Sequence, residues 1–126
     1  MKFLVCEDDM SILSLIDFKI RKSGLGEVTK AVDGRQAKQH LMNEDFDFVI
    51  TDIHVPFMSG LELVSFIRNE LKKSMPVIVL SVEELEDTVL QAFELGADDY
   101  VVKPFSPSEL VLRINRILKI NRTVSL

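Results

Sequence analysis

The sequence predicts an α/β fold in which helices cover both faces of a parallel sheet. Short apolar segments suited to strands alternate with longer segments of helical periodicity, in the order βαβαβαβαβα. The strand segments are rich in apolar and β-branched residues, which is typical of strands buried on both faces. The 126 residues fall within the size of one domain. Right-handed crossovers leave few ways to wind such a chain.

The predicted strands are short and are followed by polar or turn residues. The segment "PVIVL" is a run of apolar and β-branched residues, and "EVTKAV" alternates and is β-branched; both patterns favour strands. The predicted strands are Lys2–Cys6, Glu27–Val32, Asp47–Ile50, Pro76–Leu80 and Asp99–Val102.

The predicted helices combine an apolar face with capping signals. Ile12, Ile16 and Ile20 recur at steps of four, which places them on one helix face. Ser106 and Glu109 form a capping-box pattern with a proline at the first helical position between them. The predicted helices are Ser11–Gly24, Asp33–Met42, Gly60–Lys73, Glu83–Gly96 and Ser106–Ile120.

The helical pattern is lost in the last six residues, "NRTVSL". We therefore interpret residues 1–120 as one domain and residues 121–126 as a tail or the start of a linker.

Composition excludes several classes of function for this domain. The net charge is −5 and the basic residues are spread thinly, so the domain itself is a poor candidate for binding nucleic acid. No apolar run approaches the ~20 residues that a membrane-spanning helix needs. The single cysteine, Cys6, lies in a predicted strand, where core packing is expected. With no signal-peptide pattern, we expect a cytoplasmic protein.

Polar residues follow the predicted strands, at the edge of the sheet where α/β proteins bind ligands. Clustered carboxylates favour a hard divalent cation such as Mg²⁺, and an ammonium and a hydroxyl could neutralise a phosphoryl group in transfer. A carboxylate can itself be the nucleophile. No Gly-rich phosphate loop, zinc-type cluster or Ser–His–acid set is evident. The residues in question are Glu7, Asp8, Asp9, Asp52, Ser81 and Lys103.

Four pieces of the sequence, "FLVCEDD", "TDIHVP…SG", "LS" and "ADDYVVKPFSPSEL", together resemble the receiver domain of two-component response regulators. The resemblance runs from about Lys2 to Lys119 and covers chemotaxis-type and winged-helix-regulator-type receivers. It implies a flavodoxin-like, doubly wound sheet of five parallel strands in the order 2-1-3-4-5, with helices on both faces.

The resemblance also implies roles for the polar residues. Asp52 would accept a phosphoryl group from a sensor histidine kinase or a phosphotransfer protein. Mg²⁺ would be held by Asp8, by Glu7 through water, by Asp52 and by the backbone carbonyl of His54. Lys103 would contact the phosphoryl group. We assign Asp9 to a helix cap, and we expect the His54 side chain to be a solvent-facing bystander.

A switch and a dimer face follow from the same resemblance. Ser81 would hydrogen-bond to the phosphoryl group, and Tyr100 would turn inward when that hydroxyl moves. The charged residues Asp99, Glu109 and Arg113 match positions through which winged-helix regulators dimerise on activation. Some partner positions here are uncharged, Val89 among them.

Alternatives remain open at this stage. Ser81 could be only an N-cap paired with Glu84. Val82, a bulky residue where the family usually has a small one, could narrow access to Asp52 or restrict Tyr100. The chain could be an aspartate-nucleophile phosphatase, although His54 stands where such enzymes have a second aspartate. It could also be a degenerate receiver that acts only through interactions. We favour a signalling domain that is not an enzyme beyond its own phosphorylation and dephosphorylation, and that controls an output domain or a partner.

Overall fold

The structure, a computed structural model, describes the backbone of residues 1–125 and the side chains of residues 1–120. Its centre is a five-stranded sheet in the order β2-β1-β3-β4-β5, with every neighbouring pair parallel. The predicted fold class and strand order are thus confirmed. The strands are β1 Lys2–Cys6, β2 Glu27–Ala31, β3 Phe48–Asp52, β4 Val77–Ser81 and β5 Asp99–Val102.

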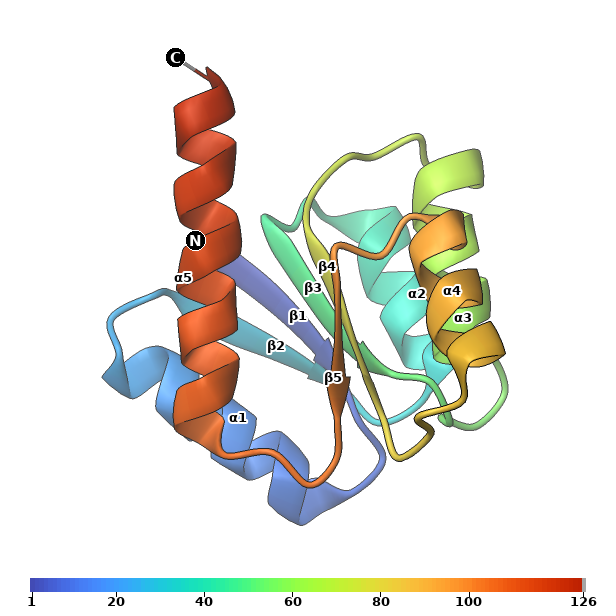
Figure 1. Cartoon of the computed structure of the whole chain (residues 1–126), viewed down its shortest axis with the longest axis horizontal. Helices are drawn as coiled ribbons and strands as arrows, with labels where there is room; N and C mark the ends of the chain where they lie inside the picture. Colours follow the sequence, from blue (N-terminus) through green and yellow to red (C-terminus); the bar gives the residue numbers. More distant parts are fainter. Residues whose placement is uncertain (126) are drawn as a thin grey trace.

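Helices cover both faces of this sheet, as predicted. Helices α1 and α5 lie on one face, and α2, α3 and α4 lie on the other (Figure 1). The helices are α1 Met10–Lys22, α2 Gly34–Asn43, α3 Gly60–Ser65, α4 Glu86–Leu95 and α5 Pro107–Ser125, with a π-helical turn, η1, at Phe66–Glu70. Within the described residues, no helix is both long and apolar enough to cross a membrane.

The core is split into two layers by the sheet. On the α1/α5 face, Ile16 and Ile20 of α1 and Leu110 of α5 are at most 1% exposed. The second layer lies on the other face and includes Leu63 and Ile67. Side chains from both faces of β1 and β3 are fully buried, which explains why these strands have no alternating pattern. Cys6 belongs to this core, as predicted, and burial raises the pKa of its thiol to about 12.

The predicted helix Gly60–Lys73 is wrong in its second half. Regular α-helix ends at Ser65, and the π-helical turn η1 follows. Lys72 then adopts a left-handed conformation with φ of 55°, which stops the helix before Lys73. The turn points Arg68 toward the start of β5, where it donates hydrogen bonds to the carbonyl oxygen of Gly96 and to Asp98.

Two other helix boundaries differ from the prediction by three residues or more. Helix α4 begins at Glu86, three residues later than predicted, because residues 83–85 form a loop over the edge of the sheet. Helix α5 continues to Ser125, past the predicted end at Ile120, since residues 121–125 contain no glycine or proline to stop it. Leu126, the last residue of the predicted tail, lies outside the described residues.

Candidate functional site

The strand register brings the predicted polar residues to one edge of the sheet. Asp52 and Ser81 are the last residues of the neighbouring strands β3 and β4. Glu7 directly follows β1, and Lys103 directly follows β5. Because parallel strands share the edge at which their carboxyl ends meet, residues from four strands converge there.

Lys103 joins two carboxylates at this edge. Its Nζ lies 2.5 Å from Oε1 of Glu7 and also forms an ion pair with Oδ2 of Asp52. Glu7 is fully buried and Asp52 is 5% exposed, so these charges interact with little screening by water. The result is an ammonium held between two buried acids.

The buried charges shift the pKa values of this group. Burial raises the pKa of Glu7, and the charge of Asp52 adds to the effect, although the hydrogen bond from Lys103 opposes it. Burial alone would lower the pKa of Lys103, but its hydrogen bonds to Asp52 and Glu7 outweigh this and raise that pKa overall. Lys103 therefore keeps its positive charge at neutral pH.

The other two acids after β1 have different surroundings. Asp8 is exposed. Asp9 is the N-cap of α1, and its Oδ1 accepts hydrogen bonds from the backbone N–H groups of Ser11 and Ile12. The assignment of Asp9 to a cap is confirmed. Its own N–H donates to Glu7 at 3.2 Å, which fixes the loop that carries Asp8.

The donor set suits a hard cation rather than a soft one. The oxygens near this edge are the carboxylates of Glu7, Asp8 and Asp52, and the expected fourth donor is the backbone carbonyl of His54. Across the described residues, no group of three or more His, Cys, Asp or Glu side chains is arranged to hold a metal ion by itself. Mg²⁺ needs less than that, because it is usually bound by one or two carboxylates and keeps several waters. The residues thus fit Mg²⁺ by chemical type.

Gly60 explains the "SG" part of the sequence motif. A Cβ atom at this position would lie 2.2 Å from the backbone oxygen of Asp52, so only glycine fits. The N–H of Gly60 donates to the carbonyl of Ile53, which folds the β3–α3 loop back against the end of β3. This close approach holds the loop that contains His54 beside Asp52.

Ser81 and Tyr100 are both buried and both bond to the same residue. The Oγ of Ser81 accepts from the N–H of Glu83, and the Tyr100 hydroxyl donates to the Glu83 carbonyl oxygen. The alternative that Ser81 caps a helix with Glu84 is wrong, because α4 begins at Glu86 and its N-cap is Leu85. Tyr100 lies inward, 8% exposed, in this structure. Its movement on phosphorylation stays a prediction.

The His54 side chain faces solvent, as expected, but it also contacts another side chain. Although it is 59% exposed, its Nε2 lies 2.6 Å from Oε1 of Glu83. The backbone N–H of His54 donates to Oδ1 of Asp52 at 2.7 Å. Sequence reasoning missed this contact; the available signal was that each residue stands two positions after the end of a strand, and that the two strands, which end at Asp52 and Ser81, are adjacent.

The residues of the predicted dimer face meet within one chain. Arg113 of α5 donates from Nη1 to both carboxylate oxygens of Asp99, at 3.1 and 3.0 Å. Its Nη2 lies 3.6 Å from Glu109. Hydrogen bonding to Asp99 raises the pKa of Arg113 further. The three charges form a cluster across β5 and α5.

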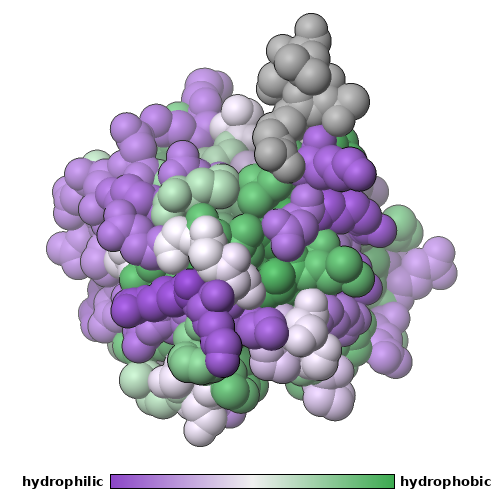
Figure 2. All heavy atoms as spheres, turned by 90° about the vertical axis from the view of Figure 1, so that its left-hand side faces the viewer, coloured by the Kyte–Doolittle hydropathy of each residue, from purple (hydrophilic) through white to green (hydrophobic). Residues whose placement is uncertain are grey.

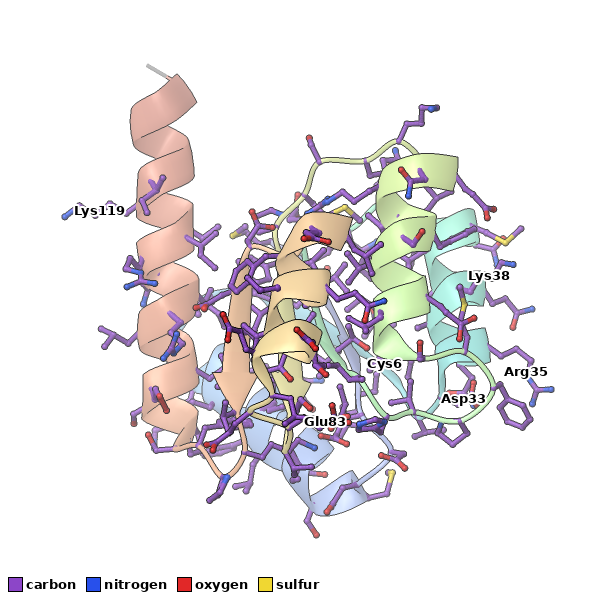
Figure 3. The ribbon with its side chains drawn as sticks, turned by 45° about the vertical axis from the view of Figure 1, so that its right-hand side comes forward. Cys6, Asp33, Arg35, Lys38, Glu83 and Lys119 are labelled. Carbon is purple, nitrogen blue, oxygen red and sulfur yellow. The ribbon has the colours of Figure 1, made fainter. Side chains whose placement is uncertain are left out.

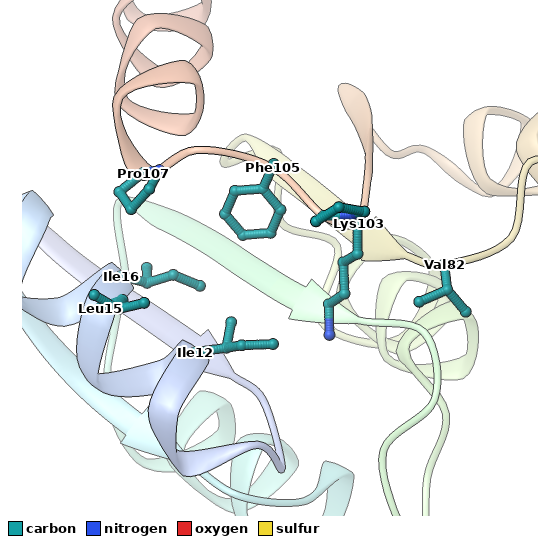
Figure 4. A pocket seen from close by; sticks show the side chains of 8 residues that line it. Ile12, Leu15, Ile16, Val82, Lys103, Phe105 and Pro107 are labelled. Atoms are coloured by element: carbon teal, nitrogen blue, oxygen red, sulfur yellow. The ribbon is translucent and has the colours of Figure 1, made fainter.

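A pocket of about 370 Å³ lies beside the acidic edge. It is mainly apolar, with Lys103 at one side and Val82 near it (Figure 4). Val82 is 67% exposed. Figure 2 shows the face with α1 and α5, where hydrophobic areas lie among hydrophilic ones. The pocket is lined by Ile12, Leu15, Ile16, Val82, Lys103, Pro104, Phe105 and Pro107.

Comparisons with known proteins agree with this geometry. A family model for the response regulator receiver domain matches residues 3–115. The chain is 35% identical to the alkaline phosphatase synthesis transcriptional regulatory protein PhoP of Bacillus subtilis, over 94% of this chain and 48% of that protein. It is 36% identical to the uncharacterised transcriptional regulatory protein YclJ of the same organism, over 94% of this chain and 51% of that one. The chain thus spans about half the length of these relatives.

Solved structures give the same result. The receiver domain of the Francisella response regulator 1452 matches with a TM-score of 0.87 and 32% identity, over 95% of this chain and 98% of that one. The BeF₃-activated DrrB receiver domain matches with a TM-score of 0.85 and 36% identity, over 94% and 97% of the two chains. The chemotaxis response regulator CheY4 of Vibrio cholerae matches with a TM-score of 0.85 and 31% identity, over 92% and 97%. This chain therefore belongs to the response regulator receiver domain family of two-component signalling.

Proposed function

We propose that Asp52 accepts a phosphoryl group in a Mg²⁺-dependent reaction and that the modified chain changes conformation to control an output domain or a partner. The observation that carries this proposal is the Lys103 ammonium between the buried carboxylates of Asp52 and Glu7. A structural lysine would not need two buried acids at the ligand-binding edge of the sheet. A phosphoryl group in transfer does need this arrangement of positive charge beside a nucleophilic carboxylate.

In the proposed reaction, an oxygen of Asp52 bonds to phosphorus while the bond from phosphorus to the donor breaks. With a phosphohistidine donor, the electron pair of the broken P–N bond stays on the imidazole nitrogen. Lys103 shifts from the Asp52 carboxylate toward a phosphoryl oxygen, and the Ser81 hydroxyl donates to another. Mg²⁺, held by Asp8, Asp52 and the His54 carbonyl, with Glu7 acting through water, would neutralise charge on the phosphoryl oxygens.

The partner we propose is a sensor histidine kinase or a phosphotransfer protein. The apolar pocket has Lys103 at its side, so a protein that delivers phosphate to Asp52 would cover it. Because the named relatives are transcriptional regulatory proteins about twice as long, we propose that this domain serves transcription regulation through an output domain. We propose a cytoplasmic location. The only chemistry proposed is gain and loss of the chain's own phosphoryl group.

Incubation with Mg²⁺ and acetyl phosphate is expected to add one phosphoryl group to the chain, measured by intact mass. An Asp52→Asn variant is expected to gain none, because the amide is not a nucleophile of this kind. The two side chains have nearly the same shape, so this control leaves the packing in place. No gain in the unmodified sequence, or an equal gain in the variant, would contradict the proposal.

Dimerisation on activation is the other partner we propose, through the cluster of Asp99, Glu109 and Arg113. Phosphorylation is expected to shift the chain from monomer toward dimer in light scattering after gel filtration. Glu109→Lys should raise the dissociation constant of that dimer at least tenfold, about 1.4 kcal/mol. The substitution puts a positive charge where the proposed face has a negative one, so it would repel positive groups across the interface, whereas Asp99 and Arg113 can still pair. A phosphorylated monomer, or a variant that dimerises equally well, would count against this face.

A further inference from the structure

We infer that Glu83 is a positioning residue whose side chain links the phosphoacceptor loop to helix α4, by way of His54 and Thr88. The inference rests on the proposed function, since it concerns how the state of Asp52 reaches the rest of the chain. It adds a side-chain route to the switch expected of Ser81 and Tyr100.

Glu83 makes four bonds to four parts of the molecule (Figure 3 labels its place before α4). Its carboxylate accepts from Thr88 Oγ1 at 3.0 Å and lies 2.6 Å from Nε2 of His54. Its backbone N–H donates to Ser81 at 3.0 Å, and its carbonyl accepts from Tyr100 at 2.9 Å. One residue therefore connects the β3–α3 loop, β4, β5 and α4.

The contacts of the Glu83 carboxylate with His54 and Thr88 form a bridge between two parts of the chain. Its far end, at His54, lies beside the phosphoacceptor Asp52. The backbone N–H of His54 donates to Oδ1 of Asp52 at 2.7 Å. Phosphorylation turns that carboxylate into an acyl phosphate, in which the Asp52 oxygens carry less negative charge and accept hydrogen bonds less strongly. The contact between the His54 backbone and Asp52 therefore changes, and the His54 ring would pass that change to the Glu83 carboxylate.

The near end of the bridge is at a helix that is held weakly. Ala92 is the one buried residue of α4, and the N-cap Leu85 makes no side-chain cap bond. Thr88, in the first turn, supplies a side-chain bond from this helix to the loop. Because few buried contacts oppose local motion of α4, the loss or movement of one such bond is expected to change its dynamics.

The bonds to Glu83 also keep its carboxylate charged. Hydrogen bonding to His54, and then to Thr88, lowers the pKa of Glu83.

The test compares unphosphorylated and phosphorylated chains in the unmodified sequence and in Thr88→Val, which removes the hydroxyl and keeps the branched shape. Hydrogen exchange of residues 86–95 reports on α4. Tyrosine fluorescence reports on Tyr100 alone, because the chain has one tyrosine and no tryptophan. In the unmodified sequence, phosphorylation is expected to change exchange in α4. In Thr88→Val this change should fall by at least half, while intact mass shows the same phosphorylated fraction.

Three further variants make the test specific. Glu83→Ala should lose the response as Thr88→Val does, whereas Glu83→Gln should keep at least half of it, because the amide still offers one acceptor and one donor. Glu84→Gln removes a charge from the exposed neighbouring position and should behave as the unmodified sequence. If Glu83 were merely structural, its substitution would lower the stability of the unphosphorylated and phosphorylated chains alike. The difference in α4 exchange between the two would then stay unchanged.

The outcomes separate the two proposals. A chain that gains no phosphoryl group overturns the proposed function and this inference with it. A chain that is phosphorylated, but whose α4 response is the same with valine at position 88, overturns the inference alone. Equal loss of response in Glu84→Gln would overturn it as well, because the effect would then be one of loop charge.

Discussion

Replacing Lys103 with methionine is expected to slow phosphorylation of Asp52 by acetyl phosphate about 10²–10³-fold, the usual cost of removing one preorganised group that stabilises developing charge. Methionine keeps much of the volume and apolar contact of the lysine stem, so the loss is one of charge. The rate of mass gain at saturating Mg²⁺ measures it. Lys103→Arg should recover part of the rate, because it restores the charge in a different geometry.

The same substitution should also lower stability. It leaves the carboxylates of Glu7 and Asp52 facing each other without the ammonium, and breaking a buried ion pair in this way costs about 3–5 kcal/mol. Glu7 is expected to respond by binding a proton, since its pKa is already raised by burial. A raised pKa in the folded chain gives stability that is present at acidic pH and lost as the pH rises through that pKa. Urea unfolding at several pH values tests this, and a variant as active and as stable as the original would contradict both expectations.

The sequence predicted the sheet well because its signals are local. The predicted strand Pro76–Leu80 is apolar and short, and its limits in the structure, Val77–Ser81, differ by one residue at each end. The convergence of Glu7, Asp52 and Lys103 needed no long-range information beyond the rule that parallel strands share an edge. The Asp9 cap was likewise predicted from its position just before a helix.

Features that depend on several loops at once could not be predicted. The bond between His54 and Glu83 joins residues 29 positions apart, and it exists only because two loops after adjacent strands turn toward each other. The π-helical turn at Phe66–Glu70 is a single turn, and Leu63, Phe66 and Ile67 around its start still fall at α-helical spacing, so the sequence pattern did not reveal it. The predicted start of α4 was also too early. Acidic residues at 83 and 84 suit a first helical turn, but in the structure Glu83 is held in the preceding loop by its contacts with Ser81 and His54.

The second large effect concerns Mg²⁺. Addition of millimolar Mg²⁺ is expected to raise the melting temperature by several degrees, because the ion binds the folded chain and relieves repulsion among its carboxylates. A free Mg²⁺ concentration about 100 times the dissociation constant would add about 2.7 kcal/mol to the free energy of unfolding. NaCl at matched ionic strength should have a much smaller effect, since it only screens exposed charges. Chelation of the ion should reverse the gain.

A variant of Asp8 distinguishes binding of Mg²⁺ at this site from general screening of charge. It is exposed, whereas Glu7 and Asp52 are buried and paired with Lys103, so Asp8→Ala should leave the metal-free melting temperature nearly unchanged. The same variant should lose most of the rise with Mg²⁺, because the ion binds through oxygen donors and this one is the most accessible. If Asp8→Ala kept the full rise, Mg²⁺ would be acting elsewhere on this acidic chain. If the unmodified chain showed no rise, the Lys103 bridge would already satisfy the carboxylates, and the proposed metal dependence would fail.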